Sequence, residues 1–324
     1  MPPLSVTDFL QIDLPALLAL VFACTACGLL GNFLVLRRQS MFGDAIAHVV
    51  LPGLVVGFLV AGSLSLPPML LGAVAAAVLA AVLIDAVHRL GRLDYGAAMG
   101  VVFTVMFALG VVLLEQAAAS SVHLDTDCVL YGQLEDILWF APTGWGSLLE
   151  PAMWAELPRE VWTLAGVAAV SGLAVALFYK ELKLTSFDPQ LASAMGIPAG
   201  AVQLGLLLLV AVAAVASFEA VGSILVIAML IGPAAVARLL TDGLGAQIAV
   251  SLVVAVSVAV FGYLLAGFGP LYVGVENSLN AAGMVALRCG LLVALAAVFA
   301  PVHGVLGRRL RQGRLAAEAR GGVA

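Results

Sequence analysis

The sequence has 324 residues, of which 63% are hydrophobic and only 10% are charged. Soluble domains are about one quarter charged, and a soluble core could not hide this much apolar surface. The composition therefore excludes a soluble protein and predicts an all-α polytopic membrane protein with a single transmembrane domain over residues 1–324. We expect the lipid bilayer as its environment and no nucleic-acid partner.

Long apolar segments follow one another along the chain. A helix needs about 20 apolar residues to cross the hydrocarbon core. We predict about nine such helices, with eight or ten as alternatives because broken helices would change the number. The predicted spans lie at about 14–36, 41–62, 68–88, 95–114, 161–179, 200–217, 221–239, 245–267 and 279–300.

Basic residues cluster at alternate ends of these spans. All of the 14 Lys and Arg residues except Arg159 and Arg288 fall on the same side. By the positive-inside rule, this side is the cytoplasm. The pattern therefore predicts a cytoplasmic C-terminus, with residues 304–324 as a basic cytoplasmic tail, and an N-terminus on the outer side.

Two ionisable side chains lie inside the second predicted span. In the stretch SMFGDAIAHVVLPGL, residues 40–54, Asp44 and His48 are four residues apart and therefore share one helix face. Ionisable groups at this depth are costly, so a functional role is the first hypothesis. Three roles fit the pair: ligands for a divalent ion such as Mn²⁺, Zn²⁺ or Fe²⁺, a structural hydrogen bond, or a proton relay.

One chain supplies too few ligands for a closed metal site. Two chains around a shared pore would supply two carboxylates and two imidazoles, and the two negative charges would balance one divalent cation. Pro52 removes the helix hydrogen bond to the carbonyl group of His48, four residues back. Freed carbonyl groups are tolerated inside a membrane where they line a cavity, so Pro52 supports the ion-path hypothesis without excluding the other two.

The longest connection, about 115–160, lies on the predicted outer side. It carries eight acidic residues and a single base, Arg159. This acidic extracytoplasmic loop either concentrates cations at the mouth of a pore, or is a solvated loop that lacks Lys and Arg because of topology alone. Glu219, in the short outer turn between the sixth and seventh spans, is either at a pore mouth or an ordinary interfacial residue.

A short helix is predicted in the stretch TSFDPQLASAMGIPAG. Asp188 suits the N-cap and Pro189 the first helical position, whereas Gly196 suits the end of the helix. Leu191 and Met195 are four residues apart and form one apolar face. Such a helix on the cytoplasmic side either docks a partner protein or simply lies on the surface.

The motifs of nucleotide hydrolysis and proteolysis are missing. The sequence contains no GxxxxGK[ST] run, so the chain does not bind ATP through a P-loop. It also contains no HExxH or GxSxG, and we expect no enzymatic activity from the chain itself. Arg288, midway along the last span, must snorkel, pair or face water, and the sequence identifies no partner for it.

Four stretches together resemble the permease subunits of the bacterial manganese/zinc ABC importers. They are GNFLVLRRQSMFGDAIAHVVLPGLVVGFL, VHLDTDCVLYGQLE, TSFDPQLASAMGIPAG and VGSILVIAMLIGPAAVARLLTD, in the family's order over roughly residues 20–310. The resemblance implies a type II importer fold in the bacterial cytoplasmic (inner) membrane, like the vitamin B12 importer permease but with fewer helices. The implied partners are a cytoplasmic ABC ATPase dimer, an extracytoplasmic metal-binding protein and a second permease chain, identical or paralogous.

The resemblance also implies roles for individual residues. Asp44 and His48 correspond to the intramembrane metal ligands of the family, and the segment at about 184–199 corresponds to its coupling helix. The expected cargo is a divalent metal ion, manganese first and then zinc or iron, with no permanently bound cofactor. Arg288 and Glu219 depart from the family pattern and indicate a modified pore. The alternatives are a proton-coupled secondary metal transporter and an ABC permease for an iron chelate.

Overall fold

A computed structural model describes residues 6–61, 66–118, 132, 134–142, 144–273, 279–300 and 304–305. Within these residues, nine helices are long and apolar enough to cross a membrane, which confirms the predicted number. The long helices are α2 (Leu14–Leu36), α3 (Phe42–Ala61), α4 (Leu66–Gly91), α5 (Tyr95–Ala118), α8 (Arg159–Leu177), α11 (Ala199–Val221), α12 (Ser223–Leu240), α13 (Leu244–Val273) and α14 (Ala281–Phe299).

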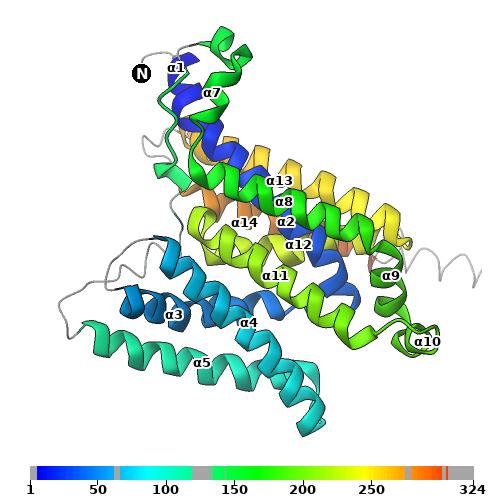
Figure 1. Cartoon of the computed structure of the whole chain (residues 1–324). Helices are drawn as coiled ribbons and strands as arrows, with labels where there is room; N and C mark the ends of the chain where they lie inside the picture. The colour runs from blue at the N-terminus through cyan, green and yellow to red at the C-terminus, as the bar shows by residue number, and fades with distance from the viewer. Residues whose placement is uncertain are drawn as a thin grey trace, which may run out of the picture.

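Shorter helices lie at the two ends of these spans. They are α1 (Val6–Asp8), η1 (Phe9–Asp13), η2 (Leu134–Asp136), η3 (Trp145–Leu149), α7 (Pro151–Ala155), α9 (Tyr179–Phe187) and α10 (Pro189–Ala194). In Figure 1, α1 and α7 lie at one end of the long helices, and α9 and α10 lie at the opposite end. These are the ends predicted as outer and cytoplasmic. Most of the predicted basic tail, 306–324, falls outside the described residues.

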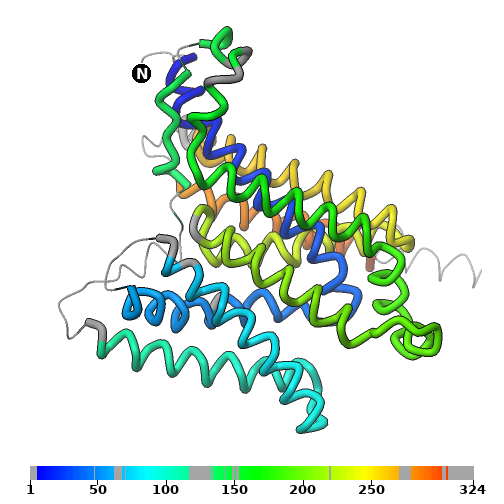
Figure 2. The backbone as a smooth tube through the Cα atoms, viewed as in Figure 1, coloured from blue at the N-terminus to red at the C-terminus, as the bar shows by residue number. Residues whose placement is uncertain are grey.

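The long helices form two groups (Figures 1 and 2). In the larger group, α2 is central and packs against α8, α11, α12 and α13, while α14 packs against α12 and α13. In the smaller group, each of α3, α4 and α5 packs against the other two; Figure 2 draws these three in blue and cyan, beside the larger group. Helix α11 joins the groups because it contacts α2 as well as α3 and α4.

Helix α2 forms the centre of the core because its sequence is apolar around the whole helix. A helix of this kind is stable where other helices surround it. Leu20, Leu30 and Phe33 are fully buried, and Cys24 and Cys27 are buried free thiols. Buried cysteines of this kind pack as small hydrophobic residues, and they extend the apolar part of this core.

Glycines allow α3 to pack closely on its neighbours. A Cβ atom added at Gly53 would meet the carbonyl oxygen of Gly72 on α4, and one added at Gly110 on α5 would lie 2.7 Å from Cδ of Pro52. Small residues permit such close approach in membranes, where helix association depends on van der Waals packing. Helix α3 continues through Pro52, so the proline lies in a tight contact with α5 rather than at a helix end.

The boundaries of the first and fifth spans differ from the prediction for identifiable reasons. The first membrane helix extends back to Val6, because the π-helical turn Phe9–Asp13 joins α1 to α2. The fifth span ends at Leu177, and α9 begins separately at Tyr179. The hydrophobic pattern does not reveal α9 because its sequence, YKELKLTSF, is largely polar.

Candidate functional site

Asp44 and His48 lie one turn apart on α3, as their spacing predicts. Nε2 of His48 is 3.7 Å from Oδ1 of Asp44, and the two side chains are 41% and 39% exposed, respectively. This distance is beyond hydrogen-bond range. The pair is therefore not closed on itself, and its oxygen and nitrogen atoms are open to a ligand.

The face of α3 that carries this pair is only partly covered by the described part of the chain. Met41, one turn before Asp44, is 59% exposed. The opposite side of the helix is buried, with Ile46 and Val49 in the core. In a membrane, a half-exposed carboxylate and imidazole must face a water-filled path or another protein chain rather than lipid.

In the described part of the chain, the pair has no third ligating side chain beside it. Among the residues that the structure describes, no group of three or more His, Cys, Asp or Glu side chains is close enough to hold a metal ion. The side chain of Glu219 falls outside the described part. Its backbone lies in the last turn of α11. The sequence had suggested a different place, the outer turn that follows this helix.

Two aromatic residues that the sequence analysis did not select lie against His48. The ring centroid of His48 is 5.4 Å from that of Phe103, with an interplanar angle of 24°. It is 5.2 Å from that of Phe107, with an angle of 75°. Phe103 and Phe107 are four residues apart on α5, and this spacing indicates that they share one face of the helix. The spacing does not indicate which neighbouring helix that face contacts.

Helix α10 has the capped ends that the sequence predicts. Oδ1 of Asp188 accepts a hydrogen bond from the backbone N–H of Leu191 at 2.9 Å, and Pro189 begins the helix. Gly196 follows with a φ of 81°, a left-handed conformation that favours glycine. Leu191 and Met195 are 48% and 59% exposed. The apolar face of α10 is therefore uncovered in the isolated chain.

An arginine connects the end of α2 to the helix before α10. The guanidinium of Arg37 donates to Oγ1 of Thr185 at 2.7 Å and to Oγ of Ser186 at 3.0 Å, both on α9. It also donates to Oε1 of Gln203 on α11 at 3.1 Å. Burial lowers the pKa of Arg37 to about 10, so the side chain stays charged at neutral pH. The sequence indicated Arg37 only as a marker of topology.

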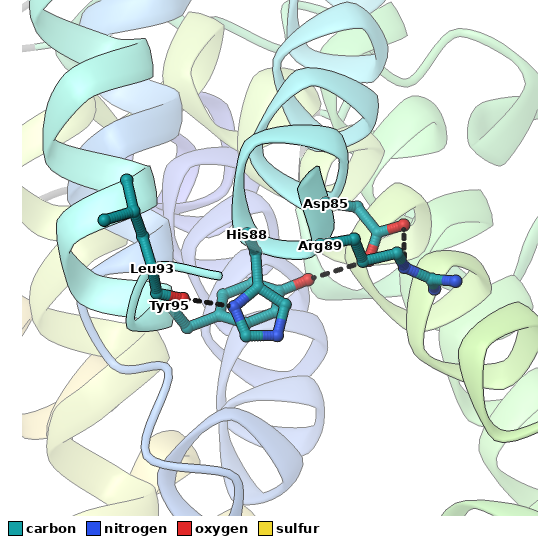
Figure 3. Close-up of polar contacts among 5 residues, drawn as sticks. All are labelled: Asp85, His88, Arg89, Leu93 and Tyr95. Carbon is teal, nitrogen blue, oxygen red and sulfur yellow. Dashed lines mark hydrogen bonds and ion pairs between the residues drawn. The ribbon is translucent and has the colours of Figure 1, made fainter. Parts of the chain in front are cut away.

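A second polar cluster holds the connection between α4 and α5 (Figure 3). Nε of Arg89 is 2.8 Å from Oδ2 of Asp85, and the hydroxyl of Tyr95 donates to Oδ1 of Asp85 at 3.5 Å. Nδ1 of His88 is 2.7 Å from the carbonyl oxygen of Leu93. These contacts hold the ends of the two helices together at the predicted cytoplasmic end.

Arg288 has a partner that the sequence did not identify. Its guanidinium carbon lies 4.7 Å from the centre of the Phe261 ring on α13. The negative face of an aromatic ring attracts a cation at this distance. The contact offsets part of the cost of placing a charge midway along α14.

Known proteins match this chain over most of its length. A family model described as the ABC 3 transport family matches residues 9–138 and 155–274. The chain is 40% identical to the manganese transport system membrane protein MntD of Bacillus subtilis, covering 90% of this chain and 93% of that protein. It is 38% identical to the zinc transport system membrane protein TroD of Treponema pallidum, covering 92% and 77%.

A solved structure also matches the fold. The structure of PsaBC from Streptococcus pneumoniae in complex with Fab is similar, with a TM-score of 0.68 and 27% identity. The match covers 91% of this chain and 94% of the other. The shared fold and the family match over both helix groups lead to one conclusion: this chain belongs to the ABC 3 transport family.

Proposed function

We propose that this chain is the permease subunit of an ATP-driven importer of a divalent metal ion, manganese first and then zinc or iron. The open pair of Asp44 and His48 inside the second membrane helix carries the proposal. A carboxylate oxygen and an imidazole nitrogen suit borderline divalent ions. Relatives named for manganese and zinc transport support this class of cargo.

The ion would be held between two permease chains, identical or paralogous. One chain offers Asp44 and His48, and its described part offers no third ligand. Two facing chains offer four ligands and two negative charges, which balance one dication. The partly uncovered face of α3 supports this arrangement, because the ligands point away from their own chain's core.

An extracytoplasmic metal-binding protein would deliver the ion at the end formed by η2, η3 and α7. Glu135, Asp136, Glu150 and Glu156 are exposed there. Such an acidic surface raises the local concentration of cations. Asp125 and Asp127, which belong to the same predicted loop, lie outside the described residues.

We assign α10 as the helix on which a dimeric ABC ATPase acts, since Leu191 and Met195 present an uncovered apolar face. Helix α10 packs on α9, where Thr185 and Ser186 hold Arg37. ATP hydrolysis would take place in the ATPase and not in this chain.

The same contacts continue toward the metal ligands through α11. Gln203 on α11 binds Arg37, and a Cβ atom added at Gly200 would lie 2.7 Å from Nη2 of Arg89 on α4. A movement of α10 can therefore reach the α3–α5 group through packed and hydrogen-bonded elements, as in the shear and hinge motions of other proteins.

Reconstitution tests the metal site directly. The permease, its ATPase and its metal-binding protein are placed in liposomes, and uptake of Mn²⁺, Zn²⁺ and Fe²⁺ is measured in competition. We expect ATP-dependent uptake that Asp44→Asn and His48→Ala abolish. Asp94→Asn, which neutralises an exposed carboxylate and can still cap α5, is the matched control. Unchanged Mn²⁺ and Zn²⁺ uptake in both site variants would refute the assignment.

The coupling helix is tested in the same liposomes. Replacing both Leu191 and Met195 with serine removes the apolar face of α10, so ATP-driven uptake should collapse while Mn²⁺ binding to the permease persists. Uptake driven by a proton gradient without ATP would instead support a proton-coupled carrier. Transport of an iron chelate in preference to the free ion would instead support an ABC permease for an iron chelate.

A further inference from the structure

Among the described residues, the ring of His48 has no hydrogen bond of the kind that usually orients a metal-binding histidine. Such histidines normally donate their second ring N–H to a carboxylate, carbonyl or water, which fixes the ring and strengthens its bond to the metal. Within the described part of the chain, no hydrogen bond to the His48 ring is present, and Asp44 is 3.7 Å away. Something else must hold the ring.

Two phenyl rings contact His48 instead. Phe103 stacks on one face of the imidazole, and Phe107 meets it nearly at a right angle. Both geometries are favoured between aromatic rings at these distances. The contacts restrict rotation of the imidazole about its χ2 angle, because rotation would drive it into the stacked ring of Phe103.

The backbone beside these rings is closely packed. Pro52, one turn after His48, contacts Gly110, which follows Phe107 on α5. The absence of a side chain at Gly110 sets how near α5 comes to α3 at this level. Phe107 is itself 40% exposed, so the rings enclose the imidazole on the α5 side and leave the side toward Asp44 open.

We propose that Phe103 and Phe107 form an aromatic slot that positions His48 for the transported metal ion. This inference rests on the proposed role of His48 as a ligand. The slot orients the ring without the acceptor that would strengthen its metal bond. Weak binding in a well-defined geometry suits a transport site, because the ion must enter readily and also leave.

The first test removes the rings and then restores them. In the complete transporter, reconstituted with its ATPase and metal-binding protein, Phe103→Leu and Phe107→Leu should each raise KM for Mn²⁺ uptake about tenfold, as loss of an orienting group does at metal sites. Phe103→Tyr and Phe107→Tyr keep a ring and should restore the wild-type KM. Phe299→Leu, at an exposed phenylalanine 63% accessible on α14, is the matched control.

The second test asks whether the rings act through His48. Calorimetry on the complete transporter, with Mn²⁺ as the only added ligand, gives the dissociation constant of the ion. The change that Phe103→Leu causes in this constant is compared in the wild type and in the His48→Gln variant. Phe103→Leu should weaken binding in the wild type and have no further effect beside His48→Gln, because coupled residues are not additive. Equal losses in both backgrounds, or a wild-type KM in both leucine variants, would overturn the proposal.

The remaining outcomes are also decisive. If a leucine variant fails to fold, the tyrosine variant at the same position is used instead. A tyrosine variant that folds but has a raised KM for Mn²⁺ overturns the slot. If His48→Ala leaves uptake unchanged, the proposed role of His48 as a ligand fails, and the slot fails with it. If His48→Ala abolishes uptake while the phenylalanine variants match Phe299→Leu, only the slot fails.

Discussion

Two of the polar sets in the described membrane helices of this chain differ in how deeply the rest of the protein buries them. In the larger group, Nδ2 of Asn32 donates to Oγ of Ser251 at 2.6 Å, and Nε2 of Gln247 donates to Oδ1 of Asn32 at 3.2 Å. All three residues are fully buried. In the smaller group, Asp44 and His48 are half exposed and do not bond each other.

The comparison separates structural polar groups from functional ones. A buried polar group in hydrocarbon must be paired, since an unpaired one carries its full desolvation penalty. Asn32 satisfies this requirement inside the protein and connects α2 to α13. Asp44 and His48 have no hydrogen-bond partner among the described residues, and their exposed atoms are accessible to water, an ion or another chain. Hydrogen bonding alone does not separate the two sets, because Oε1 of Gln247 is buried without a partner among the described residues. Exposure does separate them: of the two sets, the Asp44–His48 pair is the one that lies on an accessible face of its helix.

The largest expected effect is a loss of function with little loss of stability. Asp44→Asn and His48→Ala should reduce metal uptake to background. The free energy of unfolding in detergent should change by no more than about 0.5 kcal/mol for Asp44→Asn, as for surface substitutions. It should fall by about 1 kcal/mol for His48→Ala, because the ring contacts with Phe103 and Phe107 are lost. Strong destabilisation by either variant would show that Asp44 and His48 have a structural role like that of the Asn32 cluster.

The opposite result is expected for Asn32. Asn32→Ala leaves the buried groups of Ser251 and Gln247 with fewer partners, so the free energy of unfolding should fall by about 1–3 kcal/mol. The folded fraction should keep the wild-type KM for Mn²⁺. Ser257→Ala is a suitable control, because Ser257 bonds only the carbonyl oxygen of Val254 in its own helix. A raised KM in Asn32→Ala would assign this cluster a part in transport.

The smallest effect is expected at Arg37, whose guanidinium is hydrogen-bonded to two other helices near the proposed coupling helix. Arg37→Lys keeps the charge and loses the planar fork that reaches Thr185, Ser186 and Gln203 together. We expect a loss of about 1 kcal/mol in stability and fewer ions transported per ATP hydrolysed. An unchanged ratio of transport to ATP hydrolysis would show that Arg37 is purely structural.

Much of the fold could be predicted because its signals are local. Long apolar runs mark the spans, and the cap residues Asp188, Pro189 and Gly196 mark the ends of α10. Helix α9 could not be predicted by hydropathy because it lies outside the membrane pattern. Helix α11 runs to Val221, beyond the predicted 217, because Gly222 adopts a φ of 77° and turns the chain in a single residue.

The candidate site was predictable only in part, for a different reason. The spacing of Asp44 and His48 places them on one face of a helix, which follows from helix geometry alone. The contacts of Phe103 and Phe107 with His48, and of Phe261 with Arg288, depend on which faces of separate helices meet. That information is spread over the packing of the whole chain, so no single stretch of the sequence carries it.

The contact between Gly53 and Gly72 brings the backbones of α3 and α4 together with no side chain between them. A joint without side chains has no rotamers to exchange, so the two helices cannot slide past each other by small adjustments. We therefore expect α3, with both proposed ligands, to travel with α4 as one rigid body during transport. The relative placement of Asp44 and His48 within each chain would then stay constant through the cycle, while the walls on either side of the ion change.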